Sequence, residues 1–418
     1  TANAGLDGVR CANNAGIQLA GSVTVANGGA WSGAGGTFSP NANALNAVYT
    51  PSLGEIAAGS TTLTLTTTGN NGCSAVTDEV TYIFSPAPTA NAGPDANTCA
   101  NNATVQLNGL VTVATGGIWS GGAGSFSPNS GVLNAVYTPT AAEIAAGSVT
   151  LTLTTVGNAL CSAVSDQMTI VITPAPVVDA GLTLQSCANN PSVHLAGSVQ
   201  NATGGTWSGA GTFSPDATNL SATYTPSAAE VLAGTATVTL TSTGNGLCNA
   251  VSDQVTIIIT DAPVVEAGVA QTLCANNAAA QLAGQVTNAT GGSWSGGAGS
   301  FAPNANALNA VYTASAAEIT AGGIWLYLTS TGNGGCLASR DSVYLSYTPA
   351  PTVNAGFDAH VCANASQVSL AGSVTVASGG IWSGGAGSFT PNANDLNAIY
   401  DATPAEIATG QVSLVLTT

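Results

Sequence analysis

The sequence predicts an all-β protein, an elongated rod of tandem immunoglobulin-like antiparallel β-sandwich domains with about seven strands each. Three observations lead to this prediction. Cysteine, tryptophan, phenylalanine and tyrosine residues recur at a constant interval along the 418 residues. Between them, short segments alternate apolar and hydroxylated residues, as half-buried strands do. Clusters of glycine and asparagine separate these segments, and their rhythm is typical of an immunoglobulin-like sandwich.

The repeat is clearest in alternate cysteines, which are separated by 88, 88, 87 and 88 residues. These cysteines are Cys11, Cys99, Cys187, Cys274 and Cys362. One tryptophan recurs with each of them, at Trp31, Trp119, Trp207, Trp294 and Trp382. A constant period across several residue types indicates tandem copies of one domain. We therefore expect five immunoglobulin-like repeats, at 1–87, 88–175, 176–262, 263–350 and, as an incomplete copy, 351–418.

Proline marks the joints between the repeats. The joints read Pro86-Ala87-Pro88, Pro174-Ala175-Pro176, Asp261-Ala262-Pro263 and Pro349-Ala350-Pro351. Each proline fixes its own φ angle and restricts the residue before it to extended backbone. We therefore expect stiff spacers, in contrast to flexible Gly/Ser linkers.

Within each repeat the local pattern predicts strands and one helical turn. Residues 149–154 and 255–260 alternate apolar and hydroxylated side chains, which predicts strands with one buried face. A Ser/Thr-x-x-Glu motif recurs in every repeat and matches the capping box of a helix N-terminus. We interpret its glutamates as helix caps, not as catalytic or metal-binding groups. They are Glu55, Glu143, Glu230, Glu318 and Glu406.

Charge and hydropathy exclude several classes of protein. The chain has 2 Lys+Arg residues, Arg10 and Arg340, against 19 Asp+Glu residues, for a net charge of −17. A nucleic-acid-binding protein needs a basic surface, which this composition cannot form. No apolar run is long enough to span a bilayer, so we expect no membrane span in this segment. At 45% hydrophobic residues the composition is not that of a disordered chain.

The sequence contains no catalytic constellation, and we expect a protein that is not an enzyme. The two histidines, His194 and His360, stand at different positions of the repeat, so they form no recurring base. No serine lies in a Gly-x-Ser-x-Gly motif with a candidate histidine and acid. No His/Cys/Asp cluster has the spacing of a zinc site.

Regularly spaced cysteines without Cys-x-x-Cys motifs indicate disulfides and an oxidising compartment. Two pairings are open. Pairing within repeats would give Cys11–Cys73, Cys99–Cys161, Cys187–Cys248 and Cys274–Cys336, with the partner of Cys362 outside the chain. Pairing between repeats would give Cys73–Cys99, Cys161–Cys187, Cys248–Cys274 and Cys336–Cys362. We favour pairing within repeats, because a final strand and a joint separate Cys73 from Cys99 and laid end to end would hold them far apart.

Each periodic tryptophan lies in a Gly-Gly-x-Trp-Ser-Gly segment, such as 116–121. Such a ring could stack on a sugar face or fill the core of the sandwich. We favour the core, since one tryptophan per domain is what a sandwich of this size needs. Trp325 lies off the period, and we expect it on the surface.

Calcium is the only cofactor worth considering, and we expect none. One aspartate recurs in the four complete repeats, at Asp78, Asp166, Asp253 and Asp341. A second recurs after some joints, at Asp7, Asp95 and Asp358. Each is a lone acid, whereas a calcium loop brings several oxygen ligands together. A lone aspartate beside a strand is more often an acceptor for backbone N–H groups.

The repeats share variants of one frame: Ala-Gly-x-Asp, Cys-Ala-Asn-Asn, Gly-Gly-x-Trp-Ser-Gly-Gly-Ala-Gly-x-Phe-x-Pro, Tyr-Thr-Pro-x-Ala-Ala-Glu-Ile, Leu-Thr-Leu-Thr, a second cysteine and Ser-Asp-Gln. This frame resembles the tandem repeats of large Bacteroidota cell-surface adhesins, of which the SprB-type gliding-motility adhesin is the best-known relative. The resemblance covers essentially the whole chain. It implies immunoglobulin-like or PKD-like sandwiches, export by type IX secretion, and a surface filament that binds substratum or polysaccharide.

We therefore expect a secreted, extracellular structural and adhesive protein, the shaft of a cell-surface filament used for attachment and gliding. Two alternatives stay open. The chain could be an array of carbohydrate-binding modules that use the periodic tryptophans. It could also be a subunit of a self-assembling extracellular fibre, since weakly charged threonine-rich strand edges can pair with copies of the chain.

Overall fold

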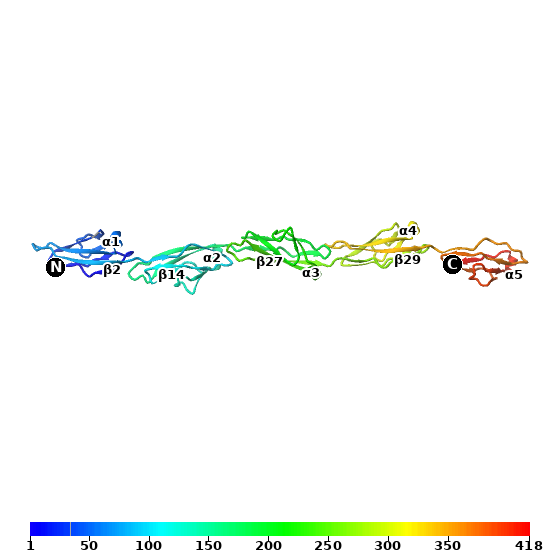
Figure 1. Cartoon of the computed structure of the whole chain (residues 1–418), viewed down its shortest axis with the longest axis horizontal. Helices are drawn as coiled ribbons and strands as arrows, with labels where there is room; N and C mark the ends of the chain where they lie inside the picture. Colours follow the sequence, from blue (N-terminus) through cyan, green and yellow to red (C-terminus); the bar gives the residue numbers. More distant parts are fainter. Residues whose placement is uncertain (34) are drawn as a thin grey trace.

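The computed structural model describes residues 1–33 and 35–418. The chain forms an elongated, almost straight array of β-domains that follow one another along the long axis (Figure 1). We name the domains 1 to 5 by the boundaries expected from the sequence, and each joint by the two domains that it connects. Each domain is a two-layer β-sandwich with one short helix, so the chain is a tandem array of immunoglobulin-like domains.

Domain 2 shows the architecture of a complete repeat. Its elements are β10 (Thr89–Asn91), β11 (Ala96–Cys99), β12 (Val105–Gln106), β13 (Leu110–Thr112), β14 (Gly116–Ser120), β15 (Ser125–Ser127), β16 (Val136–Thr138), α2 (Ala141–Ala146), β17 (Ser148–Val156) and β18 (Ser165–Thr173). One layer is the four-stranded sheet β11-β18-β17-β14, and the other holds the sheets β12-β16-β15 and β10-β13. The core between the layers contains Trp119, Tyr137, Leu151, Leu153 and Ile170.

The long hairpin β17–β18 illustrates why these residues form strands. Along β17 the buried residues are every second one, and threonines occupy most of the positions between them. Alternation of this kind places one face of a strand on the core and the other in solvent. The loop of this hairpin, residues 157–164, includes Cys161 and starts at Gly157, whose φ of 68° is a left-handed conformation that glycine adopts without steric cost.

The first cysteine-bearing strand of the larger sheet pairs in parallel with the last strand. The sequence led us to expect antiparallel pairing throughout the sandwich, so this pair differs from the prediction. In domain 2, β11 pairs with β18 in the register Ala96↔Ile170 to Cys99↔Thr173. Both strands run toward the joint with the following domain. The first cysteine of a repeat therefore lies at this joint, whereas the second cysteine lies in the hairpin loop at the opposite end of the domain.

Domains 1, 3 and 4 repeat this plan. Domain 1 has β1 (Ala2–Asn3), β2 (Gly8–Cys11), β3 (Ile17–Gln18), β4 (Ser22–Val23), β5 (Gly28–Ser32), β6 (Thr37–Ser39), β7 (Val48–Thr50), α1 (Leu53–Ala58), β8 (Ser60–Thr68) and β9 (Thr77–Ser85). Domain 3 has β19 (Val177–Asp179), β20 (Leu184–Cys187), β21 (Val193–His194), β22 (Ser198–Gln200), β23 (Gly204–Ser208), β24 (Thr212–Ser214), β25 (Thr223–Thr225), α3 (Ala228–Ala233), β26 (Thr235–Thr243) and β27 (Ser252–Thr260). Domain 4 has β28 (Val264–Glu266), β29 (Gln271–Cys274), β30 (Ala279–Gln281), β31 (Gln285–Thr287), β32 (Gly291–Ser295), β33 (Ser300–Ala302), β34 (Val311–Thr313), α4 (Ala316–Ala321), β35 (Gly323–Thr331) and β36 (Arg340–Thr348). Each of these domains thus has nine strands in its described residues, more than the seven or so expected, because the smaller layer is divided into pieces of two or three residues.

Domain 5 has a smaller set of elements. They are β37 (Thr352–Asn354), β38 (Gln367–Ser369), β39 (Ser373–Thr375), β40 (Ile381–Ser383), β41 (Ser388–Thr390), β42 (Ile399–Asp401), α5 (Pro404–Thr409) and β43 (Val415–Thr417). The larger sheet is represented here by the pair β40-β43.

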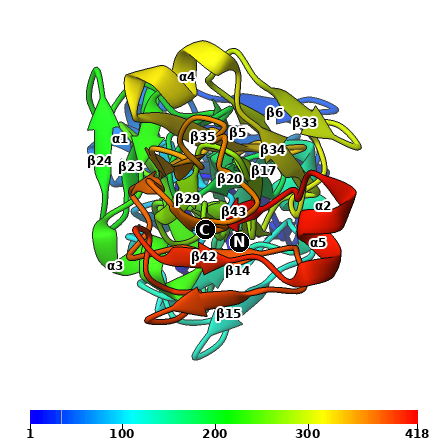
Figure 2. The same ribbon diagram turned by 90° about the vertical axis from the view of Figure 1, so that its right-hand side faces the viewer.

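Successive domains are rotated about the long axis. Seen along that axis, the helices α2, α3 and α4 lie on different sides of the molecule (Figure 2). No helix in the described residues is long and apolar enough to cross a membrane.

Candidate functional site

The most distinctive chemistry lies at the joints, where disulfides connect consecutive domains. The bonds are Cys11–Cys161, Cys99–Cys248 and Cys187–Cys336, with Cα–Cα distances of 4.9, 5.0 and 5.0 Å. Each connects the first cysteine of one repeat to the second cysteine of the next. Joints 1/2, 2/3 and 3/4 are therefore crossed by both the polypeptide and a disulfide.

The pairing expected within repeats is wrong in this structure, and so is the alternative between Cys73 and Cys99 and their equivalents. The physical reason is the position of the two cysteines within a domain. In domain 2 the nine-residue strand β18 separates the loop of Cys161 from the end that holds Cys99. At about 3.4 Å per residue this strand alone is roughly 30 Å long, far beyond the reach of a disulfide. In the described residues, Cys73, Cys274 and Cys362 form no disulfide.

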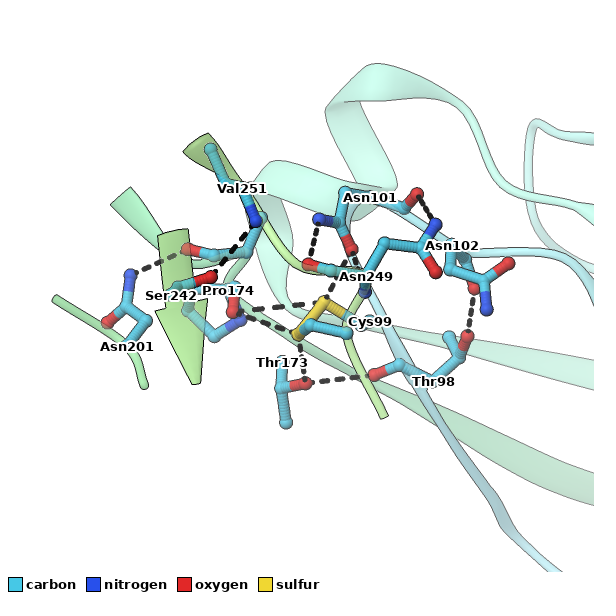
Figure 3. The surroundings of a disulfide bond; sticks show 12 residues. Thr98, Cys99, Asn101, Asn102, Thr173, Pro174, Asn201, Ser242, Asn249 and Val251 are labelled. Atoms are coloured by element: carbon cyan, nitrogen blue, oxygen red, sulfur yellow. Dashed lines mark hydrogen bonds between the residues drawn. A yellow bond between two sulfur atoms is a disulfide. The ribbon is translucent and has the colours of Figure 1, made fainter. Parts of the chain in front are cut away.

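Joint 2/3 shows how the two cysteines are brought together (Figure 3). The side chain of Asn101 lies against the backbone of Asn249 in the next domain. Its Nδ2 donates to Asn249 O at 2.9 Å, and its Oδ1 accepts from Asn249 N at 3.0 Å. Both sulfur atoms contact the carbonyl oxygen of Pro174, and Cys99 is fully buried. The amide thus holds the hairpin loop in place beside the disulfide.

The same asparagine contact occurs at joints 1/2 and 3/4, the other two joints that a disulfide crosses. Asn13 pairs with the backbone of Ser162, and Asn189 pairs with the backbone of Leu337. Because the amide contacts only backbone atoms of the next domain, the partner residue differs from joint to joint without changing the geometry. The motifs of the sequence did not predict this role of the asparagine. The signal was an asparagine two residues after each first cysteine.

A second amide contact is present at two of the four joints in the described residues. Asn201 Nδ2 donates to the carbonyl of Ala175 at 2.9 Å, and Asn288 Nδ2 donates to Ala262 at 3.1 Å. Both asparagines have φ near 60°, in the left-handed region that asparagine tolerates. The equivalent position in domains 1, 2 and 5 is a valine, also with positive φ, at Val25, Val113 and Val376. A β-branched residue is strained in that conformation and cannot donate the hydrogen bond.

The five recurring glutamates form the expected capping boxes and also contact a buried tyrosine. In domain 1, Ser52 Oγ accepts from Glu55 N, and the Glu55 carboxylate accepts from Ser52 N. Tyr49 Oη donates to Glu55 Oε1 at 2.6 Å and accepts from Gly36 N at 2.9 Å. The network ties the helix to the sheet, a role that the capping motif alone did not predict. The other capping boxes are those of Glu143, Glu230, Glu318 and Glu406.

These contacts set the protonation states of the network. Desolvation of Glu55 would raise its pKa, but hydrogen bonds from Thr61, Tyr49 and Ser52 outweigh it and lower the pKa of Glu55 to about 2. Desolvation and the hydrogen bond to Glu55 raise the pKa of Tyr49 to about 12. The glutamate is therefore ionised and the tyrosine neutral around pH 7, which suits a structural contact.

The periodic tryptophans are buried, so they are not glycan-binding platforms. The five rings are only 2–3% exposed. Their N–H groups are also occupied, as in Trp119, whose Nε1 donates to Leu133 O at 3.2 Å. Trp325 lies on the surface as expected and is 50% exposed.

The recurring aspartates accept backbone hydrogen bonds. In domain 2, Asp166 Oδ2 accepts from Ala92 N at 2.8 Å, and Asp95 Oδ1 accepts from Thr169 N at 2.7 Å. They attach the last strand to the segments that flank it. In the described part of the chain, no group of three or more His, Cys, Asp or Glu side chains could hold a metal ion.

No family model matches the chain, and no curated protein matches it. Among solved structures, it is similar to Drosophila N-cadherin EC1-4, with 12% identity, a TM-score of 0.27, and coverage of 82% of this chain and 99% of that one. It is also similar to Sidekick-1 immunoglobulin domains 1-5, with 11% identity, a TM-score of 0.26, and coverage of 82% of this chain and 79% of that one. The I-band fragment I67-I69 from titin has 12% identity, a TM-score of 0.35, and coverage of 62% of this chain and 98% of that fragment. Similarity at this level does not extend to a shared function.

Proposed function

We propose that the chain is a non-catalytic, extracellular structural and adhesive protein, the shaft of a cell-surface filament that carries tensile load. The observation that carries this proposal is the set of three disulfides that each bridge two consecutive domains. A shaft must keep its domains aligned when its ends are pulled, and a second covalent link at joints 1/2, 2/3 and 3/4 does so.

The energetics of the joints support a load-bearing role. Each disulfide closes a loop of 149 or 150 residues. In the chain-entropy model a loop of this size corresponds to about 5 kcal/mol of stabilisation relative to the open chain. A disulfide adds a second covalent link to the proline linker, and two links between the same pair of domains restrict bending more than one link does.

The disulfides support an extracellular location. Disulfides form and persist in oxidising compartments outside the cytoplasm. The first cysteine of each bridge, for example Cys187, is fully buried, which protects the bond from reductants. Together with the resemblance of the repeat frame, this favours a Bacteroidota surface filament exported by type IX secretion and used for attachment and gliding.

Shear flow tests the proposal. Producing cells should display the chain on filaments that an antibody fragment detects without permeabilisation. Cells with Cys99→Ser and Cys187→Ser should still attach at rest but should detach at lower flow rates than cells with the unchanged chain. A control with Ser162→Ala, which keeps all three disulfides and the backbone contact of Asn13, should behave like the parent. Intracellular labelling, or equal detachment of all strains, would contradict the proposal.

One observation favours carbohydrate binding as a second function, through domain 4 and not through the periodic tryptophans. Trp325 on β35 lies opposite Tyr344 on β36, with ring centroids 5.0 Å apart, and the Arg340 guanidinium lies 3.6 Å from the Tyr327 ring centroid. Domain 2 has Thr150 where domain 4 has Trp325. An exposed aromatic face of this kind can stack on sugar rings.

Glycan arrays with the whole chain test this second function. We expect neutral polysaccharides to bind and Trp325→Thr, which copies domain 2, to lower the affinity by about tenfold or more. Equal binding of the variant and its parent would exclude this surface.

A further inference from the structure

A cavity of about 690 Å³ lies at joint 3/4, beside the disulfide Cys187–Cys336. Domain 3 contributes parts of β20 and β27 to its wall, and domain 4 contributes the hairpin loop before Cys336. The linker residue Asp261 also lines it. The cavity is open to solvent, and its volume falls within the range of small-molecule sites, about 300–1,000 Å³. Such sites often lie at domain interfaces.

The linker supplies a carboxylate at this cavity. Asp261 stands where the other three linkers have a proline, and Figure 3 shows that proline, Pro174, beside the disulfide of joint 2/3. The carbonyl oxygen of Asp261 contacts both sulfur atoms, as that of Pro174 does. The residue is exposed, and its carboxylate accepts no hydrogen bond within the described residues. The charged group is therefore free to bind a ligand.

The hairpin loop of domain 4 has no side chain at one position of the cavity wall. Gly335 stands where joints 1/2 and 2/3 have Leu160 and Leu247. A Cβ atom added at Gly335 would meet no atom within 4 Å, and the φ angle of this glycine lies outside the left-handed region. A leucine therefore fits here without backbone strain, and the glycine leaves the position open.

The polar groups around the cavity have unused acceptor capacity. Asn288 and Asn333 each donate to a backbone carbonyl through Nδ2, which leaves their Oδ1 atoms as acceptors. Asn333 Oδ1 and Ser186 Oγ have no hydrogen-bond partner in the described structure. In domain 2 the position of Ser186 is taken by Thr98, whose hydroxyl donates to Asn102. Because an unpaired polar atom inside a protein costs free energy, a ligand that donates to this wall is stabilised.

A wall of this kind suits a cation that carries several hydrogen-bond donors. An ammonium group offers three N–H donors and no acceptor, and it pairs with a carboxylate. Hydroxyl groups donate to the remaining amide oxygens. A metal ion is less suitable, because no group of three or more His, Cys, Asp or Glu side chains in the described residues could hold one. The net charge of −17 also attracts cations to the chain.

We propose that the cavity at joint 3/4 binds a cationic amino sugar. The ammonium group of the sugar pairs with the Asp261 carboxylate, and its hydroxyl groups donate to the amide oxygens of Asn288 and Asn333. Both domains line the cavity, so the bound sugar contacts domains 3 and 4 at once. This site goes beyond the load-bearing function and does not depend on it.

The test uses the whole oxidised chain and three small probes in saturation-transfer NMR titrations. Glucosamine is titrated at pH 6, where its amino group is protonated. N-acetylglucosamine keeps the ring and the hydroxyl groups but has no charge, and we expect it to bind at least about tenfold more weakly. Putrescine keeps the ammonium chemistry but has no hydroxyl groups, and it should also bind more weakly than glucosamine. Added calcium should not displace glucosamine.

Two variants of the chain locate the site. Asp261→Asn keeps the size of the side chain but removes its charge, and it should lower the affinity for glucosamine by about tenfold or more. Gly335→Leu, which copies joint 2/3, should lower it by a similar factor. Glu266→Gln removes one charge from an exposed residue of β28 outside the cavity and should change nothing. Peptide mapping without reductant should show the Cys187–Cys336 bond in every variant.

Transfer of the site to joint 2/3 provides the decisive control. This joint already has Asn201 and Asn245 at the positions of Asn288 and Asn333. In the Gly335→Leu chain, the double change Pro174→Asp and Leu247→Gly should therefore restore binding.

The proposal is overturned if glucosamine does not bind, if N-acetylglucosamine or putrescine binds equally well, or if calcium displaces the sugar. An unchanged affinity of Asp261→Asn, or a transfer that restores no binding, would overturn it as well. None of these results bears on whether the chain is a load-bearing shaft, which the flow experiment decides.

Discussion

Joints 2/3 and 4/5 have the same Pro-Ala-Pro linker but differ in the contacts that reach it or cross it from the following domain. At joint 2/3, a disulfide joins Cys99 to Cys248, Asn101 holds the backbone of Asn249, and Asn201 donates to Ala175. At joint 4/5, Cys274 and Cys362 are unbonded in the described residues, and Val376 takes the position of Asn201. Because Val376 stands where joint 2/3 has Asn201, the linker of joint 4/5 lacks one hydrogen bond in the described residues although its sequence is the same.

The largest expected effect is mechanical. In the oxidised chain, the shortest covalent path between the ends follows residues 1–11, 161–187 and 336–418, because two disulfides bypass the residues between them. At about 3.6 Å per residue, full extension then reaches roughly 430 Å, whereas the reduced chain reaches about 1,500 Å. Single-molecule pulling with and without reductant measures both lengths. Equal lengths would show that the disulfides of joints 1/2, 2/3 and 3/4 do not form.

Acid should act alike on domain 1, which a disulfide joins to its neighbour, and on domain 5, which none does in the described residues. This separates the stability of the domains from that of the joints. The pKa of Glu55 is lowered to about 2, and the pKa of Glu406 in domain 5 is also lowered to about 2. A lowered folded-state pKa contributes stability that is complete above the unfolded value of about 4.5 and is lost as pH falls through about 2. We expect buried-tryptophan fluorescence to stay native at pH 4 and to change below about pH 3.

The acid prediction has a matched variant. Glu55→Gln in domain 1 and Glu406→Gln in domain 5 keep the size of the side chain but remove its charge. Both should lower stability at pH 7 and flatten the pH dependence between pH 4.5 and pH 2. If only the domain 1 variant changed the profile, the capping network would depend on the neighbouring joint.

The smallest effect concerns the amide contact at the linker. Val113→Asn and Val376→Asn should relieve strain and add a hydrogen bond to the linker, for a gain of about 1 kcal/mol each. Asn201→Val should lose a similar amount. Hydrogen exchange of linker amides in joints 1/2, 2/3 and 4/5 measures the change. If Val376→Asn alone slowed exchange at joint 4/5 to the level of joint 2/3, the disulfide would contribute little to local order.

Much of the fold could be predicted from the sequence because its signals are local. The alternation in β17 determines its buried face, and the spacing of Ser52 and Glu55 specifies a capping box. The burial of Trp119 follows from the need of a small sandwich for one large core residue. Each of these features depends on residues that are neighbours in the chain or in a single domain.

The disulfide pairing could not be predicted in this way, because it depends on which end of the sandwich each cysteine occupies. That position follows from the parallel pairing of β11 with β18, and spacing along the chain does not reveal it. The distance that the intervening segments impose correctly excluded a Cys73–Cys99 bond. The same argument was not applied to Cys99 and Cys161, which a full strand keeps apart. The role of Tyr49 was missed for a different reason, because its partner Glu55 was interpreted only as a helix cap.

The three disulfide loops, 11–161, 99–248 and 187–336, overlap in sequence. Every peptide bond between residues 11 and 336 therefore lies inside at least one loop, and those in 99–161 and 187–248 lie inside two. A protease that cuts the chain once anywhere in this region leaves a single covalent molecule. Even simultaneous cuts at joints 1/2, 2/3 and 3/4 leave all the pieces connected, so the rod tolerates backbone damage that would sever an ordinary string of domains.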